Sequence, residues 1–342
     1  MSNREKDSAL LSEFTPDTFR GKKIIVWGDF ILDEYIFTST GRISREAPVL
    51  VTEYEESCFM LGGAGNVVHN LRSLGAEPVP VGFTGDDEAG ERIRNIFSDL
   101  SVDTSFLSVV KEFTTPRKSR ILSGRDNSRK QQVLRIDYLN KDIPGPAEYE
   151  ELSGKLRSLL KNADLLLVSD YLKESVNPDL FKGIAKDFPD ISSIVDSREN
   201  LLKFNGATYV TPNEPEIRNL FPAIRFRTTG DFIKAGQKLM AMLNCNGVVQ
   251  KRGHKGMIIF EQHKDPVELP IHGVTEIVDV TGAGDTVISL LSLSIASDLG
   301  LLNSAKISNI GASMVVMKEG AYPLKAEELK SEMSLVSSDI KG

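Results

Sequence analysis

Short apolar runs alternate with amphipathic segments along most of this sequence, and no other feature narrows the possible folds as much. The apolar runs cover residues 24–27, 78–83, 163–171, 190–197, 207–213, 246–253 and 256–260. Segments with apolar positions three and four residues apart and charged positions opposite lie at 64–76, 89–100 and 148–163. Strands alternating with helices predict an α/β fold with a doubly wound, mostly parallel sheet.

Two segments do not follow this alternation. Residues 34–59 are rich in β-branched and aromatic side chains, and residues 115–139 contain two strand-like stretches around a polar SGRDNS turn. We expect antiparallel strands here, forming a small β-sheet lid over the carboxyl ends of the parallel strands. The predicted organisation is a lead-in at residues 1–20 and one domain at residues 21–342, with the lid at 34–59 and 115–139.

The charge and cysteine content exclude several classes of protein. The 342 residues include 41 Lys and Arg against 48 Asp and Glu, a net charge of −7, so no nucleic-acid binding is expected. Two cysteines, Cys58 and Cys245, provide neither a disulfide framework nor a thiolate metal site. The apolar window at residues 286–307 carries Asp298 and several serines, which predicts a buried helix rather than a membrane span. We therefore expect a cytoplasmic protein that binds no membrane.

The stretch VDVTGAGDTV places three small residues directly before a carboxylate and an apolar run. Gly282, Ala283 and Gly284 allow backbone N–H groups to converge at a helix start, where the helix dipole favours an anion. Asp285 at the same point could take a proton from an attacking hydroxyl. The alternative interpretation is a tight strand-to-helix turn in which Asp285 only caps the helix.

A second group of polar residues follows the first strand and precedes another helix. Asp29 and Asp33 lie just beyond the first apolar run, and Gly62, Gly63 and Asn66 open the helical segment that follows the lid strands. Carboxylates and a carboxamide at the carboxyl edge of a sheet suit the hydroxyls of a sugar. The alternative is a solvated turn with an ordinary helix cap.

The sequence TPNEPE offers a candidate metal site. Asn213 and Glu216 are three residues apart, so they share one face of a helical turn and could hold Mg²⁺ directly or through its waters. A Pro-Glu pair is also a common helix start, so capping is the alternative. The sequence contains neither a phosphate-binding GxxxxGK[ST] loop nor a GxGxxG after the first strand, which disfavours a P-loop kinase and a dehydrogenase.

Taken together, these motifs resemble the ribokinase-like (PfkB) family of carbohydrate kinases. Residues 61–90 are similar to the N-terminal signature of that family, VDVTGAGDTV to its C-terminal signature and TPNEPE to its NxxE motif, in the same order along the chain. The resemblance implies a kinase that uses ATP and Mg²⁺. A kinase for another sugar, sugar phosphate or nucleoside, and a non-catalytic ligand-binding homologue, remain alternatives.

The resemblance also implies roles for individual residues. It makes Asp285 the catalytic base and the Gly282–Gly284 backbone the anion hole. Sugar contacts fall on Asp29, Asp33, Gly62, Gly63 and Asn66, and the Mg²⁺–phosphate motif on Asn213 and Glu216. Residues along the nucleotide are Lys251, Gly253 and Gly256, and Asn309 matches the adenine pocket. The lid of the family often forms a homodimer, which we also expect here.

A narrower resemblance concerns the substrate. GRISREAPVLV, QQVLRIDYL and VSDYLKE are similar to the kinase domain of the bifunctional heptose enzymes of lipopolysaccharide synthesis, which phosphorylates D-glycero-D-manno-heptose 7-phosphate at its anomeric hydroxyl. The sequence stops at Gly342 without a nucleotidyltransferase signature, so we expect a separate nucleotidyltransferase to act next. Arg45, Ser197-Arg198 and Lys251 depart from the heptose-enzyme pattern.

A sugar phosphate needs local cations in such an acidic chain. Arginine suits the bidentate capture of a phosphate, and lysine can bind one as a point charge. The candidates for this contact are Arg42, Arg45, Lys118, Arg120, Lys173 and Arg198. For each of them the alternative is an exposed, solvated charge.

Overall fold

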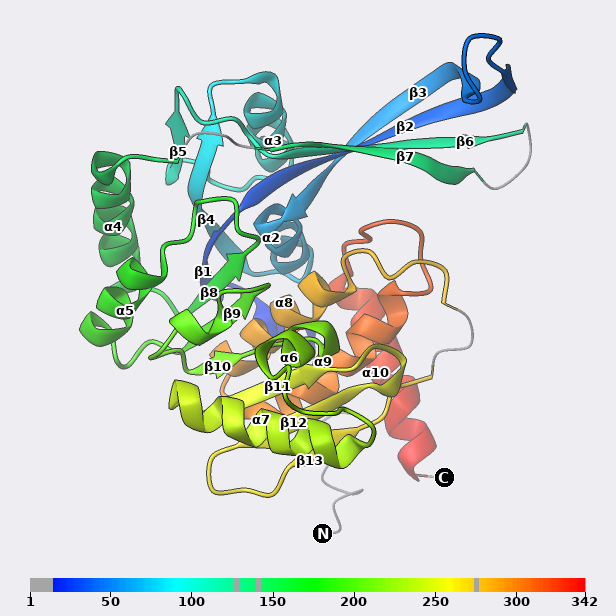
Figure 1. Cartoon of the computed structure of the whole chain (residues 1–342). Helices are drawn as coiled ribbons and strands as arrows, with labels where there is room; N and C mark the ends of the chain where they lie inside the picture. Colours follow the sequence, from blue (N-terminus) through cyan, green and yellow to red (C-terminus); the bar gives the residue numbers. More distant parts are fainter. Residues whose placement is uncertain (1–14, 126–129, 140–142, 274–276, 342) are drawn as a thin grey trace.

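A nine-stranded, mostly parallel sheet forms the centre of the molecule (Figure 1). The computed structural model describes residues 15–125, 130–139, 143–273 and 277–341. The strand order is β13-β12-β11-β10-β9-β8-β1-β4-β5, with antiparallel pairing only for β11 with β12 and β12 with β13. The strands are β1 (Lys23–Gly28), β4 (Glu77–Gly85), β5 (Leu107–Val110), β8 (Leu165–Asp170), β9 (Ser193–Ser197), β10 (Tyr209–Val210), β11 (Gly247–Lys251), β12 (Met257–Glu261) and β13 (Val267–Leu269).

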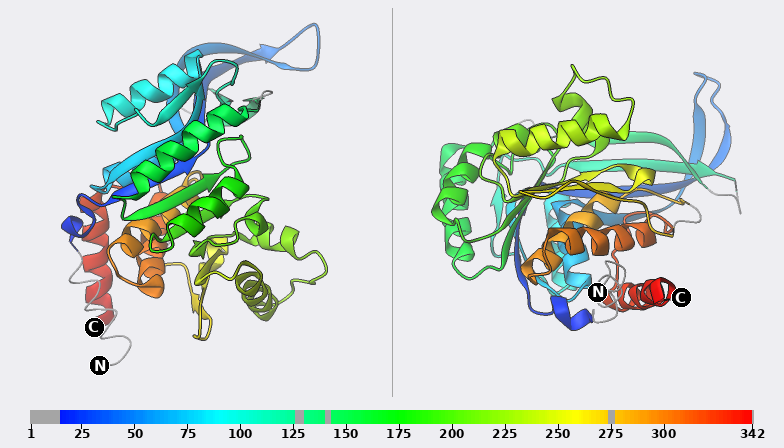
Figure 2. Two further views of the ribbon diagram at one scale, coloured as in Figure 1. Left: turned by 90° about the vertical axis from the view of Figure 1, so that its left-hand side faces the viewer. Right: turned by 90° about the horizontal axis from the view of Figure 1, so that it is seen from below.

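Helices cover both faces of this sheet (Figure 2), because its strands are apolar on both sides. In β1, Ile24 and Val26 pack into one core, while Ile25 and Trp27 pack into the other. The first core contains α2 (Ala64–Ser73), α3 (Glu88–Asp99), α8 (Ala283–Ala296), α9 (Leu301–Val315) and α10 (Ala326–Lys341). The second contains α4 (Pro146–Leu160), α5 (Pro178–Asp187), α6 (Glu214–Leu220) and α7 (Thr229–Leu243). Short 3₁₀ turns lie at η1 (Pro16–Phe19), η2 (Leu201–Lys203) and η3 (Gly253–Lys255).

A separate four-stranded sheet projects from the body of the molecule (Figure 1). It has the order β3-β2-β6-β7 and consists of β2 (Phe30–Ile43), β3 (Leu50–Gly63), β6 (Arg117–Gly124) and β7 (Gln131–Tyr138). The prediction of a doubly wound sheet with a small second sheet is therefore confirmed. The expectation of antiparallel strands in this second sheet is correct for β2 with β3 and for β6 with β7, but wrong for β2 with β6, which pair in parallel. Part of the predicted SGRDNS turn lies outside the described residues.

The prediction of one buried helix across residues 286–307 is wrong in one respect. Two helices, α8 and α9, share this window, because the backbone turns at Asp298 and Gly300, which both have positive φ angles, 60° and 72°. Asp298 thus occupies the connection and not a buried helix interior. In the part of the chain that the structure describes, no helix combines the length and the apolar character needed to cross a bilayer.

Candidate active site

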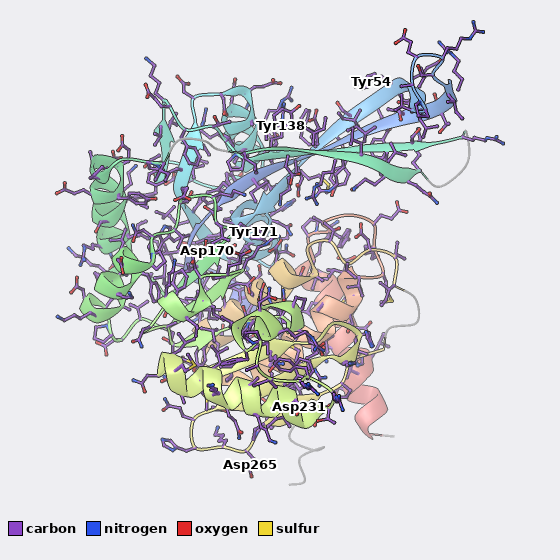
Figure 3. All side chains as sticks on the ribbon, viewed as in Figure 1. Tyr54, Tyr138, Asp170, Tyr171, Asp231 and Asp265 are labelled. Carbon is purple, nitrogen blue, oxygen red and sulfur yellow. The ribbon has the colours of Figure 1, made fainter. Side chains whose placement is uncertain are left out.

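Acidic residues gather where the central parallel strands end. Asp29 follows β1, Asp170 is the last residue of β8, and Asp196 is the next-to-last residue of β9. These strands are neighbours in the sheet, so their carboxyl ends meet at one edge. The lid strand β2 continues from Asp29, and Figure 3 shows Asp170 and Tyr171 below the lid sheet.

The carboxylate of Asp285 lies at this edge and is buried, with 6% of the residue exposed. Asn66 Nδ2 donates a hydrogen bond to one oxygen at 2.7 Å, and the Tyr171 hydroxyl donates to the other at 2.9 Å. Burial raises the pKa of Asp285 to about 6, although both hydrogen bonds oppose that rise. A carboxylate with a raised pKa, held by two donors, can accept a proton near neutral pH.

The glycines before Asp285 form the start of α8. Gly282 is the N-cap with φ 79°, and a Cβ there would lie 2.9 Å from Asn66 Nδ2. No side chain caps this helix, and Asp285 is its third residue. The alternative interpretation of Asp285 as a helix cap is therefore wrong, because its oxygens bind Asn66 and Tyr171. The Ala283 N–H, the first of α8, donates to Val280 O at 3.3 Å, so the expected anion hole loses this donor. Gly284 follows in the helix turn whose N–H groups have no partner within the helix, and it lines the cavity beside Asp285.

Asp29 organises the loop that carries Tyr171. Its carboxylate accepts hydrogen bonds from the backbone N–H groups of Tyr171, Lys173 and Ser175 at 2.7, 3.0 and 2.9 Å. In this loop Leu172 and Glu174 have φ angles of 60° and 72°, which side-chain-bearing residues rarely adopt. Burial raises the pKa of Asp29 to about 6, opposed by these hydrogen bonds. In this structure Asp29 thus positions Tyr171 against Asp285.

The Asp33 carboxylate lies next to Gly62, the first residue of the Gly62-Gly63 pair. Arg120 Nη1 donates to Asp33 Oδ1 at 2.7 Å, linking β6 to β2. A Cβ on Gly62 would lie 2.6 Å from Asp33 Oδ2, so only glycine leaves room for this carboxylate. Gly63 directly precedes α2, and its φ of 57° turns the chain from β3 into the helix that bears Asn66. The candidate sugar contacts are thus brought together, with Lys173 joining through its backbone.

Tyr171 is a site residue that the sequence analysis missed. Its hydroxyl contacts Asp285, and its ring lies against two cations, with Arg198 Cζ at 4.6 Å and Lys118 Nζ at 5.6 Å from the ring centre. The available signal was its position directly after Asp170, at the end of an apolar strand. Asp196 has the same signal and was also missed.

Asn213 and Glu216 form a capping box at the start of α6. Asn213 Oδ1 accepts from the Glu216 N–H at 2.9 Å, while Glu216 accepts from the Asn213 N–H and from Asn213 Nδ2, both at 2.8 Å. Capping, the alternative interpretation of this motif, is therefore present. Burial, and next the charge of Asp196, raise the pKa of Glu216.

These residues also fit a divalent cation. Asp196 and Glu216 repel each other in a partly buried region, and a bound cation would relieve that repulsion. Within the described ranges, no group of three or more His, Cys, Asp or Glu side chains could hold a metal. Mg²⁺ would therefore take most of its ligands from phosphate oxygens and water, which is its usual preference.

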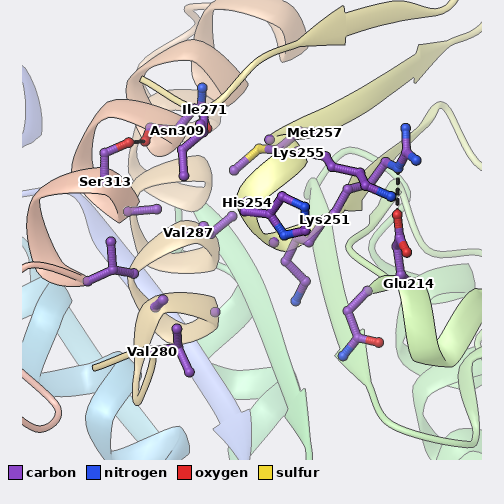
Figure 4. Close-up of a pocket in the computed structure, with 18 of the residues that line it drawn as sticks. Glu214, Lys251, His254, Lys255, Met257, Ile271, Val280, Val287, Asn309 and Ser313 are labelled. Carbon is purple, nitrogen blue, oxygen red and sulfur yellow. Dashed lines mark hydrogen bonds and ion pairs between the residues drawn. The ribbon is translucent and has the colours of Figure 1, made fainter. Parts of the chain in front are cut away.

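A cavity of about 580 Å³ opens beside the start of α8. Lys251, Gly253, Gly256 and Asn309 all line it, as do Asn213, Ala283 and Gly284. Figure 4 shows Lys251 between Val287 of α8 and Glu214 of α6, with Asn309 and Ser313 on the α9 side. Apolar walls from Ile271, Val287, Ala312 and Val316 suit a planar base, while the glycine and lysine end suits phosphates.

Comparison with known proteins identifies the family. Residues 22–328 match the family described as pfkB family carbohydrate kinase. The chain belongs to this family of kinases. It is 34% identical over 318 residues to the "Bifunctional protein HldE" of Geobacter metallireducens, and equally identical over the same length to that of Haemophilus influenzae strain PittEE. Each match covers 92% of this chain and 64% of the relative, so the chain spans less than two thirds of these curated relatives.

Solved kinase structures share the fold. A structure described as Arabidopsis thaliana ribokinase complexed with ribose and ATP has a TM-score of 0.71 at 18% identity, covering 92% of this chain and 99% of that one. Phosphofructokinase-2 from Escherichia coli in complex with potassium has a TM-score of 0.74 at 18% identity, covering 93% and 99%. The ribokinase-like fold is thereby established for this carbohydrate kinase, which is a phosphotransferase.

Proposed function

We propose that this protein transfers the γ-phosphoryl group of ATP to the anomeric hydroxyl of D-glycero-D-manno-heptose 7-phosphate, a step toward ADP-heptose for the lipopolysaccharide core. The observation that carries the proposal is the buried Asp285 carboxylate next to Gly284 at the start of α8, which lines a nucleotide-sized cavity. The choice of sugar is supported by the relatives named HldE. A kinase that consumes ATP belongs in the cytoplasm.

The proposed reaction is an in-line displacement. The anomeric oxygen forms a bond to the γ-phosphorus, the bond from that phosphorus to the β–γ bridging oxygen breaks, and its electron pair stays on ADP. The hydroxyl proton passes to Asp285, which Asn66 and Tyr171 hold in place. The backbone N–H of Gly284 at the start of α8 stabilises charge on the phosphoryl oxygens. Closure of the lid sheet would exclude water from the site.

Mg²⁺ would be held by Asn213 and Glu216, and by the nearby Asp196. When bound, it offsets the negative charge of the nucleotide phosphates. The capping box keeps Glu216 fixed at the start of α6, and the charge of Asp196 adds to the attraction for a cation. These side chains thus provide a partly buried, pre-oriented acidic surface at the cavity edge.

The cations around Tyr171 are the proposed contacts of the sugar phosphate. Lys118 and Arg198 lie against the Tyr171 ring, which itself contacts Asp285. Arg120 is bound to Asp33 in the same region. Arg42 lies nine residues beyond Asp33 on β2, roughly 30 Å along an extended strand. Arg42, and Arg45 three residues further along the chain, are therefore too distant to contact a sugar bound at Asp33 of the same chain.

A phosphate-transfer assay with ATP, Mg²⁺ and a panel of sugars and sugar phosphates tests this function. We expect heptose 7-phosphate to be the best acceptor, with a much lower Michaelis constant than the unphosphorylated heptose. Equal use of the two heptoses would remove the phosphate role of the basic residues. No transfer to any acceptor would contradict the kinase function itself.

A second candidate is a kinase for another sugar, sugar phosphate or nucleoside on the same scaffold. Its support is the departure of Ser197-Arg198 and Lys251 from the heptose-enzyme pattern, because Arg198 and Lys251 lie close to the proposed reaction centre. The same panel separates the two candidates. A different acceptor with a higher kcat/KM would favour this second one.

We also propose that the lid forms a homodimer. Every residue of β7 is exposed, and apolar side chains are prominent on this edge strand, among them Leu134 at 55% and Ile136 at 41% exposure. An exposed apolar edge strand is a ready partner for another chain. The opposite edge strand, β3, also presents Tyr54 to solvent, as Figure 3 shows for the outer part of the lid.

A further inference from the structure

A lysine ammonium lies near three carboxylates of the proposed active site. These carboxylates belong to Asp196, Glu216 and Asp285 and are called the acidic rim below. Lys251 is the last residue of β11, and only 15% of its side chain is exposed. Its Nζ donates to Asp196 Oδ1 at 2.7 Å. A Cβ on Gly284 would lie 3.9 Å from this Nζ, so the ammonium is next to the second residue of α8. Lys251 also lines the cavity.

The backbone around Lys251 is fixed from both sides. On one side, Lys251 pairs with Met257 of β12. On the other, its N–H donates to Pro212 O at 2.8 Å, and it forms a β-bridge with Asn213 at the start of the capping box. The lysine and the start of α6 are thereby held as one unit. The ammonium therefore has little freedom to leave this region, and its remaining N–H bonds are available to a ligand in the cavity.

The charged groups facing Lys251 are mainly acidic. Burial lowers the pKa of Lys251, but the charges of Asp196, Glu216 and Asp285 outweigh burial, so its pKa lies above the ordinary value and the amine is protonated. Besides Lys251, the positive charge of Arg198 also lowers the pKa of Glu216. Without Lys251 the rim would present three carboxylates to an incoming triphosphate, which would repel it.

We propose that Lys251 is a catalytic residue whose ammonium binds the γ-phosphoryl group of ATP and follows it through transfer. This inference rests on the proposed kinase function and adds a residue to it. As the acceptor oxygen bonds to the γ-phosphorus and the bridging oxygen leaves with ADP, negative charge on the phosphoryl oxygens is met by the Lys251 ammonium together with the neighbouring Gly284 N–H at the start of α8. No proton leaves the lysine in this step.

The same contacts also fit a purely structural role for Lys251. The lysine could serve only as a structural counter-ion of Asp196, linking β9 to β11. The two roles make different predictions about nucleotides. A structural ion pair would not distinguish ATP from ADP, whereas a γ-phosphoryl contact exists with the triphosphate alone.

The test compares nucleotide affinities of the wild type and Lys251→Met by titration calorimetry without any sugar. The ligands are ADP and an ATP analogue with an NH group in place of the β–γ bridging oxygen, both with Mg²⁺. We expect the variant to lose on the order of 10- to 100-fold in affinity for the analogue, as for the loss of a charge-assisted hydrogen bond. Its affinity for ADP should change by less than about threefold. Equal changes for both ligands, or none, would overturn the proposal.

Two further variants guard against misfolding and general charge effects. Lys251→Gln keeps a donor for Asp196 without the positive charge, so it replaces Lys251→Met if that variant does not fold, with the same expected selective loss. Lys264→Met removes an exposed lysine that pairs with Glu261 at 2.7 Å and is 64% exposed, and it should leave both affinities unchanged. A comparable loss in Lys264→Met would assign the effect to net charge and contradict the proposal.

Because no sugar is present, this experiment separates two failures. If the wild type binds neither nucleotide, the proposed kinase function fails. If it binds both and Lys251→Met changes neither preferentially, only the role of Lys251 fails. In a coupled assay with the acceptor identified by the panel, we also expect kcat of Lys251→Met to fall by about two orders of magnitude or more.

Discussion

At the scale of the residue, the site depends on how one carboxylate is held. Asp285 is buried and receives hydrogen bonds from Asn66, on α2, and Tyr171, on the loop after β8. These two donors come from segments far apart in the sequence and fix both oxygens of the proposed base. The buried environment keeps the pKa of Asp285 at about 6, so it is charged but still basic at neutral pH.

Asp285→Asn tests this role directly. Asparagine keeps the shape of the side chain but cannot accept the proton, so we expect turnover to fall by roughly two to four orders of magnitude. ATP affinity should change little. The matched control is Asp179→Asn, an exposed residue at the start of α5. Near-normal turnover of the Asp285 variant would contradict the assignment of the base.

The pH dependence of kcat/KM should report the same group. Asp285 with a pKa of about 6 is protonated below that pH and cannot act as a base, so activity should fall as the pH decreases through about 6. Asp29 has a similar pKa, so the acid limb belongs to both groups. Tyr171→Phe removes a donor that stabilises the charged form of Asp285 and should move the limb to higher pH. An acid limb that stays at the same pH, or moves to lower pH, in the Tyr171→Phe variant would contradict this arrangement.

At the scale of the element, helix starts supply the binding groups. The start of α8 lacks a side-chain cap, and its Gly284 N–H is the proposed phosphate donor, while the start of α6 is closed by the Asn213–Glu216 capping box. One helix end is therefore open for phosphate, and the other is stabilised internally. The capping box explains why the same sequence motif could be interpreted either as a cap or as a metal site.

Substitutions at Asn213 separate these two roles. Asn213→Ser keeps a capping oxygen, so its free energy of unfolding should stay within about 0.5 kcal/mol of the wild type, whereas Asn213→Ala should lose about 1 kcal/mol. Both variants lose the Asn213 Nδ2 contact to Glu216. If the motif also serves Mg²⁺, both should need a several-fold higher Mg²⁺ concentration for half-maximal activity. Wild-type Mg²⁺ dependence in the serine variant would leave capping as the only role.

At the scale of the whole molecule, the lid sheet carries the exposed apolar surface on which the proposed dimer rests. Its edge strand β7 is exposed throughout, and β2 carries the chain from Asp29 into the lid, away from the central sheet (Figure 1). The same strand that contributes Asp33 to the site therefore also supports the exposed apolar surface. Dimerisation would connect this surface to the geometry of the sugar site.

Light scattering on Leu134→Lys tests the dimer. We expect the wild type to have twice the chain mass of 37.7 kDa and the variant to shift toward the single-chain mass, because a lysine on β7 would have to be buried in the interface. Leu335→Lys on α10, where the leucine is 62% exposed and distant from the lid, is the control. A wild type that is monomeric at all concentrations would refute the lid dimer.

Much of the architecture could be predicted from the amino-acid sequence alone. Alternating apolar runs and amphipathic segments indicated a parallel sheet with helices on both faces, since each element records its own periodicity. Gly282 and Gly62 could be identified from the sequence as structurally required glycines. A backbone position with a positive φ, or with a neighbouring atom too close for a Cβ, favours glycine. The sequence also placed Asp285 at a helix start and Asn213 with Glu216 on one turn.

Only the tertiary structure decided which of these groups meet. Tyr171 contacts Asp285 across 114 positions, and Lys251 reaches Asp196 across 55. Such contacts depend on which strands are neighbours and on where each one ends, and no local pattern encodes that pairing. The sequence thus determined the fold and the types of chemical group present. Three-dimensional packing determined the hydrogen bonds, the burial and the charge balance on which the proposed roles of Asp285 as a base and of Lys251 as a phosphate ligand depend.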